Sequence, residues 1–397
     1  MATGVMFHSV GLRRYNWVSP QISEDVDVFR CKIESLHRVG YRSVQFSSPE
    51  FLSADAAPAV CLTFDDGYLD NWVHVFPILE KLGMQATIFV TTDFIDPRDV
   101  LRQRAAYEFR DDSSHHPAEC CAGFLSWPEM KAMERSGLVE IQSHAKTHTR
   151  WFRGPRVVDY WRPGAATRPG GPVWMLWNHS PEGKPFYLSE AAEQERQIPY
   201  GTPIYECGKA LETRRWHPEE PALEAELVER VRRGGGASFF TREGWRSVLN
   251  AVVEKVREGP GGRGRFETQE EFHHRVRSEL AASKATLEEG LGHEVQALVW
   301  PGGGVTPDVV RIAREIGYRR FTLPRQLVGD PVVETDMFSR VSSGCRVWWG
   351  ARDLGNVTGA EFLWHLGRSE GRRGDSMKLQ VARLARKVAW LSGRRPD

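Results

Sequence analysis

Two adjacent carboxylates stand where a buried strand is predicted to end. Residues 59–64 form a continuous apolar run, which is typical of a strand buried on both faces, and Asp65, Asp66 and Gly67 follow it directly. Neighbouring side chains of an extended segment point in different directions, so we expect Asp65 and Asp66 to do different jobs. Their chemistry suits one carboxylate to metal binding and the other to accepting a proton.

Two histidines, His144 and His148, follow another predicted strand at residues 139–141. In a helical turn, a separation of four places both imidazoles on one side, close enough to share a metal. One carboxylate and two histidines make a three-ligand set that leaves positions for water and substrate, as catalytic metal sites do. Either pair alone is a common pattern; the prediction depends on finding both at consecutive strand ends.

The elements that must position these residues alternate between strand and helix. This alternation indicates βα units and a parallel sheet or barrel, whose strand ends build the active site. The helix predicted at 23–39 has Ser23 as its N-cap and Gly40 just beyond its end. The predicted strands are 5–7, 59–64, 86–90, 139–141, 295–300 and 320–323, and the other predicted helices are 72–82, 127–136, 267–289 and 307–316.

The βα rhythm breaks between residues 150 and 266. This stretch is rich in proline but also contains six tryptophans, whereas a linker would be polar and poor in aromatic residues. We therefore expect a folded insertion over the active-site face. Its tryptophans suit sugar stacking or simply the core of the insertion, and its arginines suit phosphate or carboxylate.

Composition excludes several classes of protein. The chain has 397 residues with 53 Lys and Arg against 52 Asp and Glu, a net charge of +1, which argues against a nucleic-acid-coating protein. No transmembrane run or signal peptide is visible, and the six cysteines show no metal or disulfide spacing. We therefore expect a cytoplasmic protein with free thiols.

The motifs resemble those of the NodB-homology polysaccharide deacetylases, carbohydrate esterase family 4. Residues 63–67 (Thr-Phe-Asp-Asp-Gly) match the first motif, and residues 143–148 (Ser-His-Ala-Lys-Thr-His) are similar to the second. Residues 300–303 (Trp-Pro-Gly-Gly) stand where the third is expected, and residues 7–11 (Phe-His-Ser-Val-Gly) resemble the start of one branch. The resemblance covers residues 1–148 and about 267–345.

The resemblance implies a fold and a reaction. The fold would be a distorted (β/α) barrel of about seven parallel strands, here with the large insertion and a C-terminal helix. The reaction would be hydrolysis of the N-acetyl group of an amino sugar, with a divalent metal, most commonly zinc, as the cofactor. Asp65 would be the base, Asp66, His144 and His148 the metal ligands, and the backbone near Gly302 an oxyanion donor.

The sequence departs from the family pattern in three places. Ala145 replaces a Ser or Thr that usually braces the second-motif loop. Val299 replaces an Arg that would orient the base, for which Arg340 is a substitute. The Leu-x-His of the general acid has only a loose counterpart at residues 363–365, so His365 and His8 are rival candidates for the acid. Pro301, Gly302 and Arg340 complete the predicted substrate-contacting set.

Three domains follow: a barrel of residues 1–149 and 267–345, the insertion 150–266, and an extension 346–397. In the extension, five apolar residues recur at spacings of four and three within a basic segment. This pattern predicts an amphipathic helix, either packed on the domain with a solvated basic face or docked on an anionic membrane or a partner. The apolar residues are Met377, Val381, Leu384, Val388 and Leu391.

Three functions compete. The first is a sugar N-deacetylase acting on a polysaccharide or glycan precursor. The second keeps the site but cleaves another bond, as an O-acetyl esterase or an amidase on a small acylated substrate. The third is a non-catalytic glycan-binding barrel, against which the intact Asp65, Asp66, His144 and His148 count.

Overall fold

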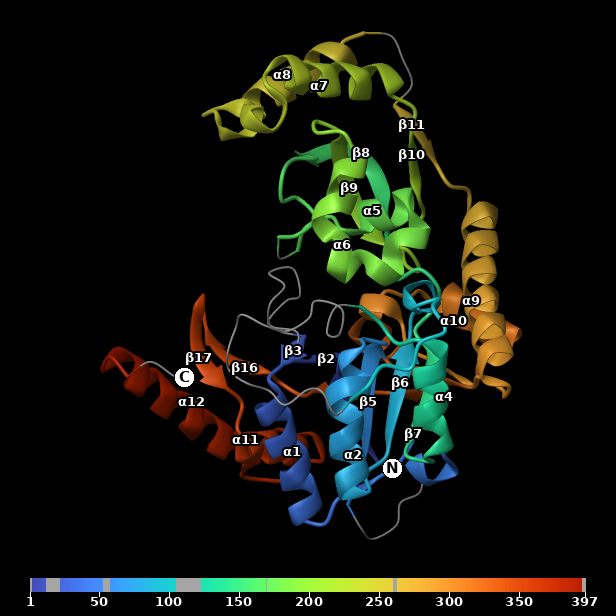
Figure 1. Ribbon diagram of the computed structural model, residues 1–397, viewed down its shortest axis with the longest axis vertical. Coiled ribbons are helices and arrows are strands. Elements are labelled where there is room, and N and C mark those ends of the chain that lie inside the picture. Colours follow the sequence, from blue (N-terminus) through green and yellow to red (C-terminus); the bar gives the residue numbers. More distant parts are fainter. Residues whose placement is uncertain are drawn as a thin grey trace.

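A nearly closed barrel of parallel strands forms the base of the molecule (Figure 1). The computed structural model describes residues 2–11, 22–52, 58–104, 123–168, 170–259 and 263–394. Eight strands pair in the order β14-β13-β12-β7-β6-β5-β1-β15, and every pairing between neighbours is parallel. The two strands at the ends of this order are separated in the chain only by Ser339, so the chain itself almost closes the sheet. The strands are β1 (Thr3–Phe7), β5 (Ala59–Asp66), β6 (Ala86–Val90), β7 (Val139–Ser143), β12 (Ala297–Leu298), β13 (Arg320–Thr322), β14 (Met337–Phe338) and β15 (Arg340–Ser342), with β4 (Arg42–Ser43) pairing beside β5.

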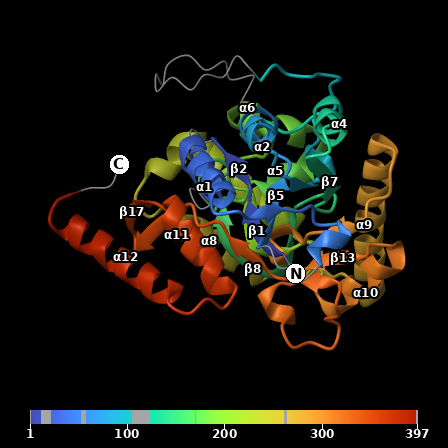
Figure 2. The same cartoon turned by 90° about the horizontal axis from the view of Figure 1, so that it is seen from below.

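Helices surround this sheet, as the view from below shows (Figure 2). Their apolar faces pack against the strands, because each helix carries buried residues at helical spacing, such as Phe29, Ile33 and Leu36 of α1. The barrel is the fold that the sequence predicts. The helices are α1 (Val26–Arg38), α2 (Phe76–Leu82, preceded by a π-helical turn, Asn71–Val75), α4 (Trp127–Arg135), α9 (Gln269–Leu291), α10 (Pro307–Ile316) and α11 (Gly359–Ser369).

The first helix begins later than predicted. Ser23 and Glu24 form a short strand, β3, that pairs with β2 (Ser9–Val10), and the N-cap is Asp25. The prediction of Ser23 as the cap was wrong because strand pairing with a distant segment, which local sequence does not show, takes precedence over capping. Gly40 does follow the helix end, in the left-handed conformation predicted for that position.

The insertion lies above the barrel in Figure 1, on a hairpin of two long strands. β8 (Arg150–Tyr160) pairs antiparallel with β9 (Pro203–Lys209), outside the barrel sheet. Two separate apolar clusters fill the insertion, one around Trp161 and Trp174 and one around Leu223 and Leu227. Some of its tryptophans therefore form its own core. Its other elements are α5 (Trp174–His179), α6 (Tyr187–Gln194), β10 (Trp216–Pro218), α7 (Pro221–Arg233), α8 (Trp245–Arg257) and β11 (Gly264–Phe266).

The C-terminal extension is a hairpin followed by two helices. β16 (Arg346–Trp349) pairs antiparallel with β17 (Arg352–Asn356), and α12 (Asp375–Leu391) packs on α11. Residues 377–391 are helical, as their spacing predicts, but the five apolar side chains of that spacing are exposed rather than packed on the protein. Within the described residues, no helix combines the length and the apolarity needed to cross a bilayer.

Candidate metal centre and active site

The two carboxylates at the end of β5 diverge, as predicted. Asp66 has a positive φ of 76°, which is uncommon for a residue other than glycine, and Gly67 continues the turn with a φ of 77°. Asp65 and Asp66 are both buried, with 3% and 5% of their surface exposed. Asp65 faces Arg340, which reaches it across β1, whereas Asp66 faces the histidines of the second motif.

Asp66, His144 and His148 form one cluster. The Asp66 Oδ1 oxygen lies 3.4 Å from His144 Nε2 and 3.3 Å from His148 Nε2. The three potential ligand atoms lie within 4.8 Å of one another. His144 donates its Nδ1–H to the Val299 carbonyl at 2.9 Å, because a carbonyl can only accept. In the neutral imidazole, this hydrogen bond fixes the tautomer in which Nε2, facing the cluster, is free to bind a metal.

The loop that carries both histidines is not a helical turn. Ala145 and His148 have positive φ values of 60° and 44°, and residues 144–149 lie in no helix. The assumption that a spacing of four implies one helix face was therefore wrong. The loop instead turns back on itself, and its backbone, rather than helical periodicity, brings the two imidazole rings to 5.1 Å between centroids.

A serine one position before the motif braces this loop. Ser143 Oγ accepts a hydrogen bond from the Ala145 backbone N–H at 3.1 Å. It also lies 3.0 Å from both Ser283 Oγ and the hydroxyl of Tyr318. These contacts hold the loop although position 145 is alanine.

The cluster fits a divalent metal. Among the described residues, Asp66 Oδ1 is a buried oxygen that accepts no hydrogen bond, an arrangement that is costly unless a cation is bound there. Burial, with a contribution from the charge of His144, lowers the pKa of His148 to about 4, so its imidazole is neutral at pH 7. Burial opposes charging of His144 too, but its hydrogen bond to Asp66 and the charges of Asp65 and Asp66 raise its pKa, so a bound cation would have to displace a proton there. A carboxylate and two imidazoles are the oxygen and nitrogen donors that zinc accepts. These three residues would hold the metal.

Asp65 forms a bidentate ion pair with Arg340. The guanidinium donates from Nη1 to Asp65 Oδ1 at 2.6 Å and from Nη2 to Oδ2 at 2.8 Å, and Nη1 also donates to Thr63 Oγ1. Burial would raise the pKa of Asp65, but the charge and hydrogen bonds of Arg340 outweigh burial and lower the pKa below its ordinary value. Asp65 is therefore ionised at neutral pH, the state that a base requires.

The register of the barrel explains how Arg340 reaches Asp65. Gly4 of β1 pairs with Arg340 on one side and with Cys61 of β5 on the other. A side chain at Gly4 would meet Arg340 Cγ at 3.1 Å, so the missing side chain lets the arginine lie across β1. The structure thus places Arg340 where it can orient the base. As a substrate contact it stays a prediction.

We expect Arg340→Met to lower kcat by about tenfold or more while metal content stays normal, because Asp65 would lose its orientation. KM should change little, and Arg340→Lys should recover part of kcat through a single ionic hydrogen bond. Steady-state kinetics with metal analysis of both variants would check this. A higher KM at unchanged kcat would instead assign Arg340 to substrate binding.

The structure places the two candidate general acids, His8 and His365, in different parts of the fold. His8, directly after β1, has its Nε2 3.9 Å from Asp65 Oδ2 and its side chain 18% exposed. Its backbone carbonyl accepts a hydrogen bond from Asn71 Nδ2. His365 lies in α11 and lines a separate cavity with Arg346 and Arg383, so the structure does not bring it to the cluster.

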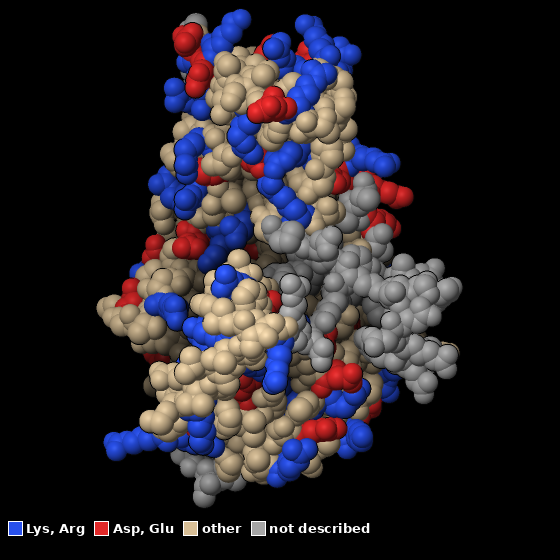
Figure 3. Space-filling view, turned by 90° about the vertical axis from the view of Figure 1, so that its left-hand side faces the viewer, with Lys and Arg blue, Asp and Glu red and all other residues tan. Residues whose placement is uncertain are grey.

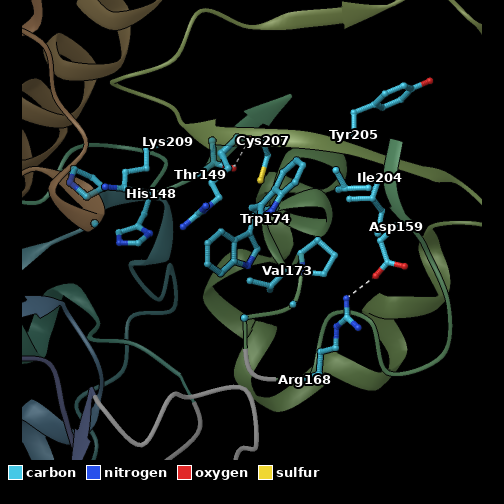
Figure 4. Close-up of a pocket in the computed structure, with 18 residues that line it drawn as sticks. His148, Thr149, Asp159, Arg168, Val173, Trp174, Ile204, Tyr205, Cys207 and Lys209 are labelled. Carbon is cyan, nitrogen blue, oxygen red and sulfur yellow. Dashed lines mark hydrogen bonds and ion pairs between the residues drawn. The ribbon is translucent and has the colours of Figure 1, made fainter. Parts of the chain in front are cut away.

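A cavity of about 490 Å³ extends from His148 into the insertion (Figure 4). Pro301 and Gly302 line it together with His148; that they contact substrate stays a prediction. The insertion supplies its other walls, with Lys209 beside His148 in the close-up. Sequence reasoning missed these insertion residues, because proximity across the fold leaves no local signal. They include Arg150, Arg168, Trp174, Trp177, Tyr205 and Lys209.

A buried lysine of the insertion also supports the second-motif loop. Lys184 is 2% exposed and donates to Asp93 Oδ2 at 2.7 Å and to the Thr147 carbonyl at 3.1 Å. The Asp93 backbone N–H in turn bonds to the Lys146 carbonyl, so the contact joins the insertion to the loop before His148. Sequence reasoning missed Lys184 as well.

Replacing Lys184 by methionine is expected to weaken metal binding by about tenfold to a hundredfold, because the loop before His148 loses its support. Asp93 would keep its ion pair with Lys146, so no carboxylate is left unpaired. Competition with a chelator would measure the affinity. Arg156→Met, which removes an exposed ion pair with Glu206 in the same insertion, is the control and should change nothing. A folded Lys184→Met protein with normal affinity would contradict the expectation.

Comparisons with known proteins concern the segment that contains the two aspartates and the two histidines. Residues 53–167 match the family model for polysaccharide deacetylases. A putative polysaccharide deacetylase of Bacillus subtilis, YxkH, is 31% identical over 124 residues, which are 30% of this chain and 36% of that protein. The chain thus spans about a third of the length of this curated relative.

Solved structures similar to this one include two deacetylases. A de-N-acetylase from Aggregatibacter actinomycetemcomitans is 16% identical, with a TM-score of 0.48 over 86% of this chain and 94% of that chain. The BpsB deacetylase domain from Bordetella bronchiseptica is 17% identical, with a TM-score of 0.45 over 86% of this chain and 95% of that chain. The matched family segment contains Asp65, Asp66, His144 and His148. Through residues 53–167, this chain is thus similar to the polysaccharide deacetylases.

Proposed function

We propose that the protein is a metal-dependent hydrolase that removes the N-acetyl group from an amino sugar of a polysaccharide or glycan precursor. The observation that carries the proposal is the pairing of two sites at one strand end. Asp66, with its orphaned oxygen, belongs to a three-ligand cluster, and the adjacent Asp65 is ionised and held by Arg340. The similarity of residues 53–167 to polysaccharide deacetylases supports the same reaction.

Each side chain has a distinct role in this proposal. Asp66, His144 and His148 would hold the metal, which we propose to be zinc; such an ion supplies Lewis acidity toward the amide carbonyl and lowers the pKa of water. Asp65 accepts the proton of the attacking water, and Arg340 fixes the carboxylate that does so. His8, close to Asp65 and partly exposed, is the proposed donor of the proton that the leaving amine requires.

The cavity beside His148 is the proposed sugar-binding site. Its walls combine aromatic rings with polar groups, as sugar sites require. Trp174 and Trp177 line it, and aromatic rings of this kind are suited to stacking on a sugar face. Arg150, Arg168 and Lys209 also line it, which suits a substrate that bears anionic groups.

Acetate release tests the reaction. The metal-loaded protein would be given oligomers of N-acetylglucosamine and, separately, an O-acetylated sugar polymer. We expect acetate from the N-acetylated substrate, at a higher rate than from the ester and dependent on the metal. Faster release from the ester would favour the O-acetyl esterase, and no release from either, with metal bound, would leave the non-catalytic glycan-binding barrel.

Location and partner are separate proposals. The sequence suggests a cytoplasmic protein, and fractionation of cells that express the natural gene would test this prediction. We also propose a peripheral contact between α12 and a membrane, which the packing of that helix supports.

A further inference from the structure

We infer that α12 docks on anionic lipid through an apolar stripe that faces away from the protein. The stripe is the set of five residues at spacings of four and three, and each of its side chains is mostly exposed. Other large hydrophobic residues exposed in the described structure occur singly along the chain. The exposed fractions are 69% for Met377, 62% for Val381, 62% for Leu384, 58% for Val388 and 64% for Leu391.

The side of the helix opposite the stripe packs inward and is anchored by Arg386, with Leu379, Ala382 and Trp390 also partly buried there. Arg386 donates to both carboxylate oxygens of Glu361, from Nε at 2.9 Å and from Nη2 at 2.6 Å. It also donates to the Leu354 and Asn356 carbonyls, both at 2.7 Å. Rotating the stripe inward would break these four hydrogen bonds and leave the largely buried Glu361 without its ion pair, with only its hydrogen bonds from Thr358 remaining. The outward stripe is therefore set by specific contacts of the opposite face.

Cations border the stripe on both sides. At about 100° per residue, Lys378 and Lys387 fall on opposite edges of the apolar face. Lys378 Nζ pairs with Asp375 Oδ1 at 2.8 Å, and Lys387 Nζ lies 5.2 Å from the centre of the Trp349 ring. Long lysine side chains at such positions lay their apolar stems along a membrane surface while the charged heads reach the lipid phosphates. Residues 366–394 carry eight Lys and Arg against two Asp and Glu. This surface is complementary in charge to an anionic leaflet.

The surroundings of the helix fit a lipid interface. The β16–β17 hairpin places Trp349 beside Trp390 of α12, with the guanidinium of Arg352 4.8 Å and 4.5 Å from the two rings. Tryptophan is favoured at membrane–water interfaces. α12 lies at the outer edge of Figure 1, and Figure 3, seen from that side, shows Lys and Arg side chains around uncharged surface in its lower half.

Charge also favours lipid over a second copy of the chain. Two α12 helices joined through their stripes would bring the lysine borders of one copy against those of the other, and like charges at an interface oppose association. A leaflet rich in anionic lipid satisfies both the apolar stripe and its cations. The inference concerns binding only, so its test is independent of whether the barrel hydrolyses acetylated sugars.

Vesicle flotation with the full chain tests the inference. The vesicles would be phosphatidylcholine alone or phosphatidylcholine with about one third phosphatidylglycerol, and we expect binding to the anionic vesicles only, decreasing as salt increases. The double variant Leu384→Gln with Val388→Gln should bind about a hundredfold more weakly, since two side chains lose their apolar contact. Lys378→Gln with Lys387→Gln should bind about tenfold more weakly.

The control is Val328→Gln, which replaces another apolar residue that is 68% exposed and lies outside α12; it should bind as the unaltered chain does. Equal vesicle binding by the Leu384 and Val388 double variant would overturn the inference. So would an absence of vesicle binding combined with a dimer in solution that the same double variant dissociates, because the occupant would then be a second copy.

Discussion

Replacing Asp66 by alanine is expected to remove the bound divalent metal and to lower the rate of N-acetyl hydrolysis by about a thousandfold or more, because the metal supplies several kcal/mol of transition-state stabilisation. The same result is expected for His144→Ala, since both residues belong to the three-ligand cluster. Metal analysis of the purified proteins beside acetate release would check both effects together.

His293→Ala is the matched control for the histidine substitution. His293 is 42% exposed and pairs with Glu134 on the barrel surface, away from the ligand cluster, so metal content and rate should both be unchanged. About one metal ion per chain in the unaltered protein, absent from Asp66→Ala and His144→Ala, would establish the centre. Equal metal content in all four proteins would show that the cluster is not where the metal binds.

Asp65→Asn should have the complementary effect: turnover falls by about a thousandfold while metal content stays normal, because the side chain can no longer accept a proton. Asparagine is nearly isosteric, so the contact with Arg340 is partly kept and the fold should not change. Rates on N-acetylated oligomers, with metal content measured on the same preparation, separate this substitution from those of the ligands.

Together, Asp65→Asn and Asp66→Ala distinguish a residue that accepts a proton from a residue that binds the metal. The residues are adjacent in the chain, yet the turn at Asp66 sends them to different partners, Arg340 and the histidines. Near-normal activity in Asp65→Asn would mean that another group accepts the proton. Loss of metal in Asp65→Asn would mean that Asp65 belongs to the ligand set.

The cluster of Asp66, His144 and His148 could be predicted from sequence because its members lie in short motifs at the ends of two parallel strands of one sheet, β5 and β7, with β6 between them. Asp66 ends β5, and His144 follows β7 directly. Parallel strands place their carboxyl ends at one edge, so strand order alone brings such residues together. The local geometry was harder to predict: the His144–His148 loop is held by Ser143 and by the insertion, not by a helical turn.

Arg340 and His365 show that a match to a sequence motif does not predict where a residue lies in the fold. Arg340 reaches Asp65 from a distant strand because β15 pairs with β1 in a register that sets Gly4 between them. His365 matches the Leu-x-His pattern but lies on α11, away from the cluster. Both outcomes depend on strand register and helix placement, which long-range packing decides.

By itself, the sequence determined the alternation of strands and helices, the residues of the metal cluster and the amphipathic character of residues 377–391. Each of these depends on neighbours within a short segment. Only the tertiary structure decided that the insertion contributes Lys184 and the cavity walls, and that α12 turns its apolar stripe outward. Periodicity shows which side chains share a helix face, but partners from distant segments, here Glu361 and the carbonyls of β17, determine which face is buried.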